Sequence, residues 1–234
     1  KNISSNLTLL GLRSINFGAG DNSLLSELAS YVEYCDKLSP KTVVWFYYEG
    51  NDFGGISAEY RSTILRKYYT DSLFSQDLIS KQNYIDKFLK DSYEKNYNSL
   101  ISKIKKLSLY NRLNYHLNKI LSINQIKKEK LFFDILKRVN NDCKNKKRRF
   151  LFVYLPSWDR FYEKDIFDSG INRSSVLSFL KKEEIEFYDF IKDITLDSIT
   201  GPKKYFSSAR GHYNSLGYKI LSEKIYEVII KTNH

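Results

Sequence analysis

An unbroken run of six apolar or aromatic residues, Val43 to Tyr48, constrains the fold more than any other feature. A run of this kind is typical of a strand covered on both faces, as in a parallel sheet with helices on each side. The polar and turn-forming residues Glu49, Gly50, Asn51 and Asp52 follow at once. In open α/β sheets, ligands bind just beyond the carboxyl ends of the strands. This turn is therefore a candidate site, although Gly-Asn-Asp is also ordinary turn sequence.

The apolar pattern alternates between strand and helix along the chain, which is typical of an α/β domain. Residues 13–20 predict a short strand that ends in a glycine-rich turn, and residues 23–38 predict a helix capped by Asp21 or Asn22. Together with the strand from residue 42, they form a βαβ unit and predict a parallel sheet. Further strands are predicted at 149–157 and 185–190, and further helices at 174–182 and 214–231.

The segment between residues 56 and 147 shows no strand pattern. Apolar residues recur at three- and four-residue spacing in four stretches, 58–69, 74–93, 99–121 and 124–141, which predicts helices. So much helix between two strands exceeds an ordinary crossover connection. We therefore interpret residues 56–147 as a helical insertion or lid, and residues 1–55 and 148–234 as the two parts of one α/β domain.

The net charge of +11 is concentrated in one segment. Residues 101–149 carry fifteen lysines and arginines against three acids, whereas the rest of the chain is close to neutral. Such a segment can bind an anionic partner, namely a membrane surface, an acidic polysaccharide or nucleic acid. Its aromatic residues fall on helical apolar stripes rather than among the charges, which argues against a specific nucleic-acid interface. Because the whole chain is rich in lysine, asparagine and isoleucine, the excess can also be compositional.

Other residue types restrict the function further. No run of about 18 apolar residues occurs, so we expect no transmembrane segment in this chain. Cys35 and Cys143 have neither metal-ligand spacing nor a paired framework, and they give no information on the redox compartment. The only histidines are His116, His212 and His234, which leaves little room for a histidine-rich metal site. We expect neither a metal nor another cofactor.

Three polar motifs lie at the ends of predicted elements: residues 16–21 (Asn-Phe-Gly-Ala-Gly-Asp), 50–52 (Gly-Asn-Asp) and 211–214 (Gly-His-Tyr-Asn). In order and context they resemble three of the four signature blocks of the SGNH (GDSL-type) hydrolase family. The resemblance covers the chain from about residue 10 to residue 229, apart from the helical segment. It implies a flavodoxin-like three-layer α/β/α fold and serine-dependent acyl transfer, usually ester hydrolysis.

Carried over position by position, the resemblance implies roles for three residues. The backbone N–H of Gly20 and the side-chain amide of Asn51 would donate to the oxyanion of the acyl-transfer intermediate. His212 would be the general base that activates a serine and then protonates the leaving group. Asp52 is expected to brace its own turn rather than react. Asn214 and Gly217 are expected to start and pack the last helix, and His116 and His234 are expected to be uninvolved.

Two departures from the family pattern affect this interpretation. No Gly-Asp-Ser block, which would carry the nucleophile, occurs in the chain, and Ser4 and Ser5 lack its strand-to-turn context. Because the sequence contains no methionine and begins at Lys1, we expect the first strand and its serine to lie upstream and the chain without them to fold poorly. The family also usually has an aspartate three residues before the histidine, where this chain has Ala209. Either another group, such as Asp197 or a backbone carbonyl, orients His212, or the enzyme uses a Ser-His dyad.

These observations leave three hypotheses. The first is an SGNH-type esterase or O-acyltransferase that acts on an acylated carbohydrate or lipid of the cell envelope, in an extracytoplasmic or membrane-associated location. The second is a non-catalytic module of the same fold that binds an anionic envelope polymer, which Ala209 favours. The third, a nucleotide-binding flavodoxin-like protein, is weaker, because residues 16–21 lack the full Gly-x-Gly-x-x-Gly pattern and no Walker lysine is present.

Overall fold

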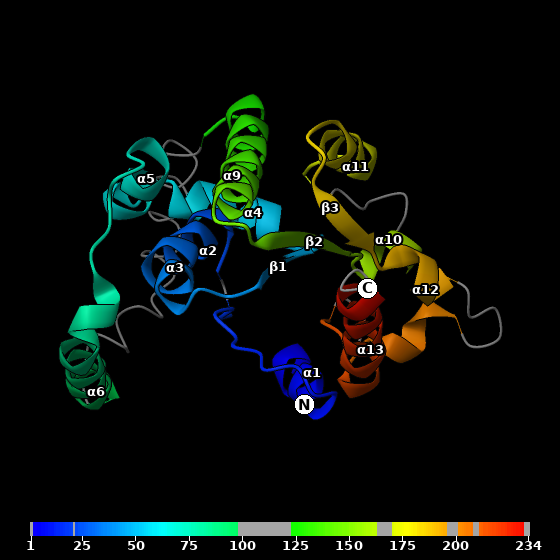
Figure 1. Cartoon of the computed structure of the whole chain (residues 1–234), viewed down its shortest axis with the longest axis horizontal. Helices are drawn as coiled ribbons and strands as arrows, with labels where there is room; N and C mark the ends of the chain where they lie inside the picture. Colours follow the sequence, from blue (N-terminus) through cyan, green and yellow to red (C-terminus); the bar gives the residue numbers. More distant parts are fainter. Residues whose placement is uncertain are drawn as a thin grey trace, which may run out of the picture.

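The computed structural model describes residues 2–20, 22–97, 123–162, 170–195, 201–207 and 211–231. Its centre is a parallel sheet of three strands in the order β1-β2-β3 (Figure 1). The strands are β1 (Thr42–Tyr48), β2 (Arg149–Leu155) and β3 (Glu186–Asp189). Thr42 pairs with Arg149, and Leu151 pairs with Glu186. The three strands predicted from residues 42, 149 and 185 are therefore confirmed, and their carboxyl ends lie at one edge of the sheet.

The strand predicted at residues 13–20 is wrong, because this segment is irregular in the structure. Most of its side chains are exposed, and the side chain of Asn16 turns back to accept a hydrogen bond from the N–H of Gly18 at 3.0 Å. Such a local turn replaces the ladder of hydrogen bonds that a strand needs from a neighbour. Among the described residues, β1 consequently has a pairing partner on one side only, which is β2.

Alternate residues of the strands enter two separate hydrophobic clusters, as the side chains of a strand point to opposite faces. Phe150, Phe152 and Tyr154 belong to the first cluster, whereas Leu151 and Val153 belong to the second. The prediction that the strand from Val43 to Tyr48 is covered on both faces holds, since Trp45 joins the first cluster and Phe46 packs against the second. The protein is thus an α/β protein with a parallel sheet between two layers of helices.

The first face is covered by the helices above the sheet in Figure 1. The predicted helix 23–38 exists, but it changes pitch on its way: α2 (Leu24–Ser30) continues through a π-helical turn (Tyr31–Cys35) into α3 (Asp36–Leu38). The other helices of this layer are α4 (Asp52–Glu59), α5 (Thr63–Thr70), α9 (Gln125–Asn145) and α11 (Arg173–Lys182). The predicted helix at 174–182 corresponds to α11.

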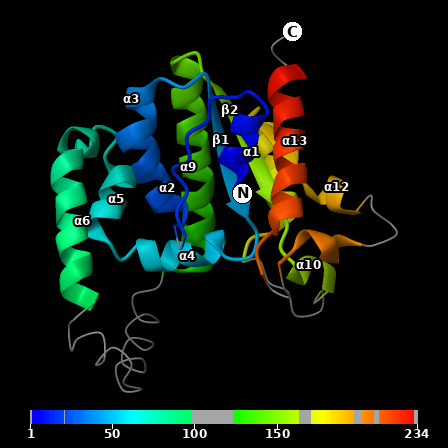
Figure 2. The same cartoon turned by 90° about the horizontal axis from the view of Figure 1, so that it is seen from below.

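The second face is covered mainly by α13 (Ser215–Lys231), the helix predicted at 214–231, which packs against α1 (Ile3–Leu9) (Figure 2). Three short elements also lie on this side of the sheet: α10 (Asp159–Tyr162), α12 (Ile191–Thr195) and the 3₁₀-helix Pro202–Tyr205. Leu221, Ile225 and Ile229 of α13 are buried against the sheet, in agreement with their helical spacing. None of the described helices has the length and apolar character needed to cross a membrane.

Much of the segment 56–147 belongs to the main core in the structure. Helix α9 lies directly on β2 and buries Phe132, Ile135 and Val139 there, as the crossover helix of a parallel sheet does. Helix α6 (Gln82–Tyr97), preceded by the 3₁₀-helix Leu78–Lys81, lies at the margin of the molecule in both views (Figures 1 and 2). The predicted helix 99–121 and His116 lie outside the described residues, and the three-part division of the chain stays a prediction.

Several basic side chains of the described part of segment 101–149 contact groups of the protein itself. Lys137 pairs with Glu183 at 2.7 Å, and Lys146 pairs with Asp36 at 2.7 Å. Lys128 lies 5.0 Å from the centre of the Phe53 ring, within range of a cation–π interaction. Among the residues that the structure describes, part of the positive charge therefore balances the protein's own acids. Binding of an anionic partner by this segment stays a prediction.

Candidate functional site

The Tyr48 side chain brings two of the predicted motifs together at the carboxyl edge of β1. The His212 ring packs against the Tyr48 ring with 4.8 Å between the ring centres, and the Tyr48 hydroxyl donates to the Gly211 carbonyl oxygen at 3.3 Å. On the same tyrosine, a Cβ added at Gly50 would lie 2.5 Å from Cε1 of the ring. A side chain at residue 50 would therefore require the Tyr48 ring to move.

His212 is exposed, and its backbone carbonyl oxygen is hydrogen-bonded. Both the N–H and the hydroxyl of Ser207 donate to the His212 carbonyl oxygen at 3.0 Å. The hydroxyl of the next residue, Tyr213, donates to the Pro156 carbonyl oxygen at 2.6 Å, which ties the loop to the end of β2. An exposed imidazole next to a hydrogen-bonded backbone has the access that a general base needs.

Asn51 and Asp52, which are neighbours in the chain, use their side chains differently. Asn51 is exposed, sits at the N-cap position of α4 and makes no side-chain capping bond there. Its amide is therefore not used to cap the helix. Asp52, in contrast, turns back and accepts the N–H of Tyr48 at 2.6 Å. The prediction that Asp52 braces its own turn is confirmed.

The third predicted residue, Gly20, lies in the irregular segment before α2. It is exposed, and no atom lies within 4 Å of a Cβ added there. Three residues later, Ser23 donates its hydroxyl to the Asp52 carbonyl oxygen at 2.5 Å. The glycine-rich segment thus enters the fold beside the turn that carries Asn51. The structure gives no contact of Gly20 itself with Asn51 or His212.

The predicted cap of α2 is wrong. A residue far away in the sequence binds the free N–H groups at the start of this helix. The N-cap position is Ser23, not Asn22, and its side chain makes no capping bond; Asp21 lies outside the described residues. The Glu59 carboxylate instead accepts the N–H groups of Ser23 at 2.7 Å and Leu25 at 2.8 Å. A carboxylate at this position satisfies the free N–H groups of the helix and complements its dipole.

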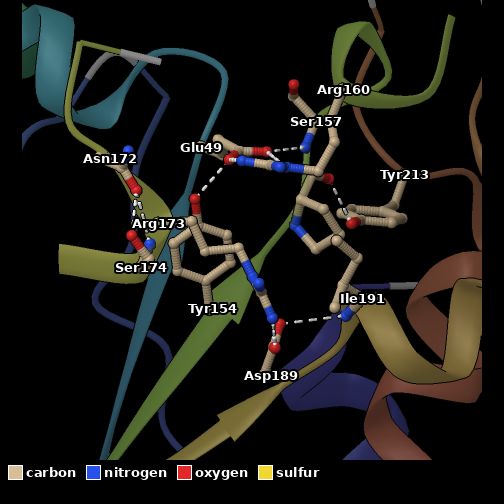
Figure 3. A network of polar contacts seen from close by, with 11 residues as sticks. Glu49, Tyr154, Ser157, Arg160, Asn172, Arg173, Ser174, Asp189, Ile191 and Tyr213 are labelled. Carbon is tan, nitrogen blue, oxygen red and sulfur yellow. Dashed lines mark hydrogen bonds and ion pairs between the residues drawn. The ribbon is translucent and has the colours of Figure 1, made fainter. Parts of the chain in front are cut away.

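A buried polar network next to Asn51 was missed by the sequence interpretation (Figure 3). Glu49 directly follows β1, and its side chain is completely shielded from water. Arg160 Nε lies 2.9 and 2.7 Å from its two carboxylate oxygens, the Ser157 N–H donates to it at 3.2 Å, and the Tyr154 hydroxyl also donates to it. Burial, with the charge of Glu49 added, raises the pKa of Tyr154. A sequence signal existed, because an acid directly follows the apolar run.

A second ion pair with a buried carboxylate lies at the end of β3. The Arg173 guanidinium, at the start of α11, donates to the Asp189 carboxylate and lies 5.9 Å from the centre of the Tyr154 ring (Figure 3). Asp189 also accepts the N–H of Ile191 at 3.3 Å. At the carboxyl end of each outer strand of the described sheet, a buried carboxylate is therefore bound by an arginine, Arg160 of α10 for Glu49 and Arg173 of α11 for Asp189.

The described residues include no serine hydroxyl that donates to the His212 imidazole. The Ser207 hydroxyl is used by the His212 carbonyl oxygen, and Ser157 is fully buried. Ala209 and Asp197, the positions considered for an acid partner, lie outside the described residues. Within the described part of the chain, no group of three or more histidine, cysteine or acidic side chains is placed to hold a metal ion.

Comparison with protein families, with characterised proteins and with solved structures gives no match for this chain. The α/β class with a parallel sheet is therefore established by the structure alone. The SGNH resemblance depends on the three sequence motifs alone.

The first residues of α13 pack tightly against neighbouring residues, and a substitution at Gly217 tests this packing. Asn214 caps this helix by accepting the N–H groups of Leu216 and Gly217, both at 3.0 Å, as predicted. A Cβ added at Gly217 would lie 2.5 Å from the Tyr205 carbonyl oxygen. We expect Gly217→Ala to lower the free energy of unfolding by about 1–3 kcal/mol, measured by urea denaturation. Gly54→Ala in α4, where no atom lies within 4 Å, should be neutral or stabilising; equal losses would contradict this packing.

Proposed function

We propose that this chain carries the acyl-transfer site of an SGNH-type serine esterase or O-acyltransferase. The observation that carries the proposal is the contact of Tyr48 with both the Gly50-Asn51 turn and His212. Tyr48 and Gly211 are 163 residues apart in the chain, and their hydrogen bond joins, at the carboxyl edge of a parallel sheet, two motifs that the family would use together. This edge is the usual position of a ligand site in such sheets.

In the proposed mechanism, His212 accepts the proton of a serine hydroxyl as that oxygen attacks the acyl carbon, and later returns it to the leaving group. The Asn51 side-chain amide and the Gly20 N–H donate to the carbonyl oxygen as it becomes an oxyanion. The serine is not assigned to any residue of this chain; in the proposal it comes from a Gly-Asp-Ser block upstream. No metal or other cofactor is part of the proposed mechanism.

The proposed substrate is an acylated carbohydrate or lipid of the cell envelope, and the proposed location is extracytoplasmic or membrane-associated. Both are extensions by analogy with the family, since fold and motifs do not specify a substrate. The excess of basic residues in segment 101–149 is compatible with an anionic polymer or surface as partner.

A non-catalytic module that binds such a polymer is the second candidate. The observation that favours it is Ala209, which stands where the family usually has the aspartate that orients the histidine. A module of this kind would keep the fold and the exposed residues Asn51 and His212 but would not turn over an ester.

The test is ester hydrolysis by the product of the full gene, with p-nitrophenyl acetate as the substrate. We expect His212→Ala to lower kcat by about a thousandfold or more and Asn51→Ala by roughly a hundred- to a thousandfold. His116→Ala, a histidine that the motifs leave uninvolved, is the matched control and should keep wild-type turnover. Turnover that survives in His212→Ala would refute the proposed mechanism. Absence of turnover in the wild-type protein would favour the binding module.

A further inference from the structure

Glu49, the residue directly before the Gly50-Asn51 turn, has a buried side chain that is bound by several partners. Glu49 directs its carboxylate into the interior, where burying a charge is strongly unfavourable unless the charge is paired and hydrogen-bonded. Arg160 supplies the opposite charge in a fork, with Nε within 2.9 Å of both carboxylate oxygens. The Tyr154 hydroxyl and the Ser157 N–H complete the set. All three partners come from β2 or the segment that follows it.

This network extends the connection between β1 and β2 beyond the last strand residues. The N–H of Glu49 donates to the Leu155 carbonyl oxygen at 2.9 Å, and its side chain then binds Ser157 and Arg160 farther along the chain. Glu49, which leads into the Gly50-Asn51 turn, is therefore held through both its backbone N–H and its side chain. Asn51 makes no side-chain bond of its own to the helix that follows, so its direction depends on this backbone.

We propose that Glu49 and Arg160 are positioning residues that hold the Asn51 amide at the candidate site. A donor that is to stabilise an oxyanion must already point at it, because reorienting it during the reaction would cost part of its stabilisation. The catalytic consequence rests on the function proposed above, whereas the structural consequence does not. Loss of the pair should loosen the turn at residues 49–53 before it affects the rest of the sheet.

The structure offers a matched control in the pair Arg173–Asp189. The two arginines are equally exposed, at 26% of the side chain, and their acids are similarly buried, at 0% for Glu49 and 5% for Asp189. Removing either arginine leaves a buried carboxylate without its charge partner, with a similar loss of global stability. Only Arg160 is bound to the residue that leads into Asn51.

Hydrogen–deuterium exchange on the folded protein tests the structural part. In Arg160→Gln, we expect backbone amides of residues 49–53 to exchange at least about tenfold faster than in Arg173→Gln, whereas residues 187–191 should show the reverse. If the two variants change exchange at residues 49–53 equally, or not at all, the proposal is overturned. Should Arg160→Gln fail to give a cooperative melt, Arg160→Lys keeps the charge but not the planar fork, and should still exchange faster at 49–53 than the matching Arg173→Lys.

Ester turnover by the full-length protein tests the catalytic part separately. Arg160→Gln should lower kcat by roughly ten- to a hundredfold with little change in KM, and Arg173→Gln should keep kcat within about threefold. Equal kcat values in the two variants would overturn the positioning role. If the wild-type protein shows no turnover, the proposed function fails, and the exchange comparison still decides whether Glu49 and Arg160 order the turn.

Discussion

Replacing Glu33 with alanine will lower the free energy of unfolding by about 3–5 kcal/mol, because this one carboxylate organises a whole loop. Glu33 lies in the π-helical turn after α2 and is only 1% exposed. It accepts hydrogen bonds from the Tyr68 hydroxyl at 2.6 Å and from the Leu78 N–H at 2.7 Å, and also from Ser75 and Gln76. In the alanine variant, these donors would lose their acceptor in a place where water replaces it only in part.

Urea denaturation at neutral pH measures this loss. Asp77→Ala, in the same loop, removes a half-exposed surface ion pair with Lys37 and should cost much less than Glu33→Ala. Glu33→Gln, which keeps one acceptor oxygen, should fall between the two variants. A loss in Glu33→Ala no larger than that in Asp77→Ala would show that the loop does not depend on the carboxylate.

Glu33 also makes the stability depend on acid pH. Burial would raise the pKa of Glu33, but the hydrogen bonds from Tyr68, Leu78, Gln76 and Ser75 together hold this pKa below its ordinary value. The folded protein therefore releases this proton more readily than the unfolded chain does. The stabilisation is present above the ordinary glutamate pKa and is lost as the pH falls through the lowered one.

Asp52→Asn will have the opposite effect and stabilise the protein above neutral pH. Burial raises the pKa of Asp52 to about 7; the hydrogen bond from the Tyr48 N–H opposes this rise, and the charge of Glu59 adds to it. Between roughly pH 4 and 7, the folded protein keeps a proton that the unfolded chain has released, so stability falls as the pH rises. Asparagine carries no charge and can still accept the Tyr48 N–H. We expect a gain of roughly 2–4 kcal/mol at pH 8 and almost none at pH 4.

Thermal and urea unfolding between pH 4 and pH 8 check this prediction. Asp86→Asn on the exposed surface of α6 is the control and should leave the pH profile unchanged. Part of the slope should remain in Asp52→Asn, because burial, followed by the charges of Asp52 and Glu59, also raises the pKa of Glu27. A variant that is less stable than the wild type at pH 8 would show that the Asp52 charge is needed in the turn.

The sequence predicted those parts of the fold that have a strong local pattern. The apolar runs at residues 42–48 and 149–155 are strands, and the periodic segments that correspond to α11 and α13 are helices. Asp52 braces its turn and Asn214 caps α13, since both interactions are made within four residues of the side chain. Such short-range interactions can be predicted from sequence patterns because they do not depend on the rest of the chain.

Interactions between distant residues were not predictable in the same way. The segment at residues 13–20 has strand-like composition, yet it is irregular, because a strand forms only where another strand receives its hydrogen bonds. The cap of α2 comes from Glu59, 36 residues after Ser23. Arg160 is 111 residues from Glu49, and no spacing rule connects two residues so far apart.

The sequence by itself determined the α/β class, most of the elements around the sheet and the identity of the candidate residues Gly20, Asn51 and His212. Only the tertiary structure decided that Tyr48 joins His212 to the Asn51 turn, that α9 covers the sheet, and that a buried Glu49–Arg160 pair lies directly before the Gly50-Asn51 turn. The physical reason is the range of the forces involved. Backbone propensity and apolar periodicity act over a few residues, whereas burial, charge pairing and strand pairing depend on which distant segments fold against one another.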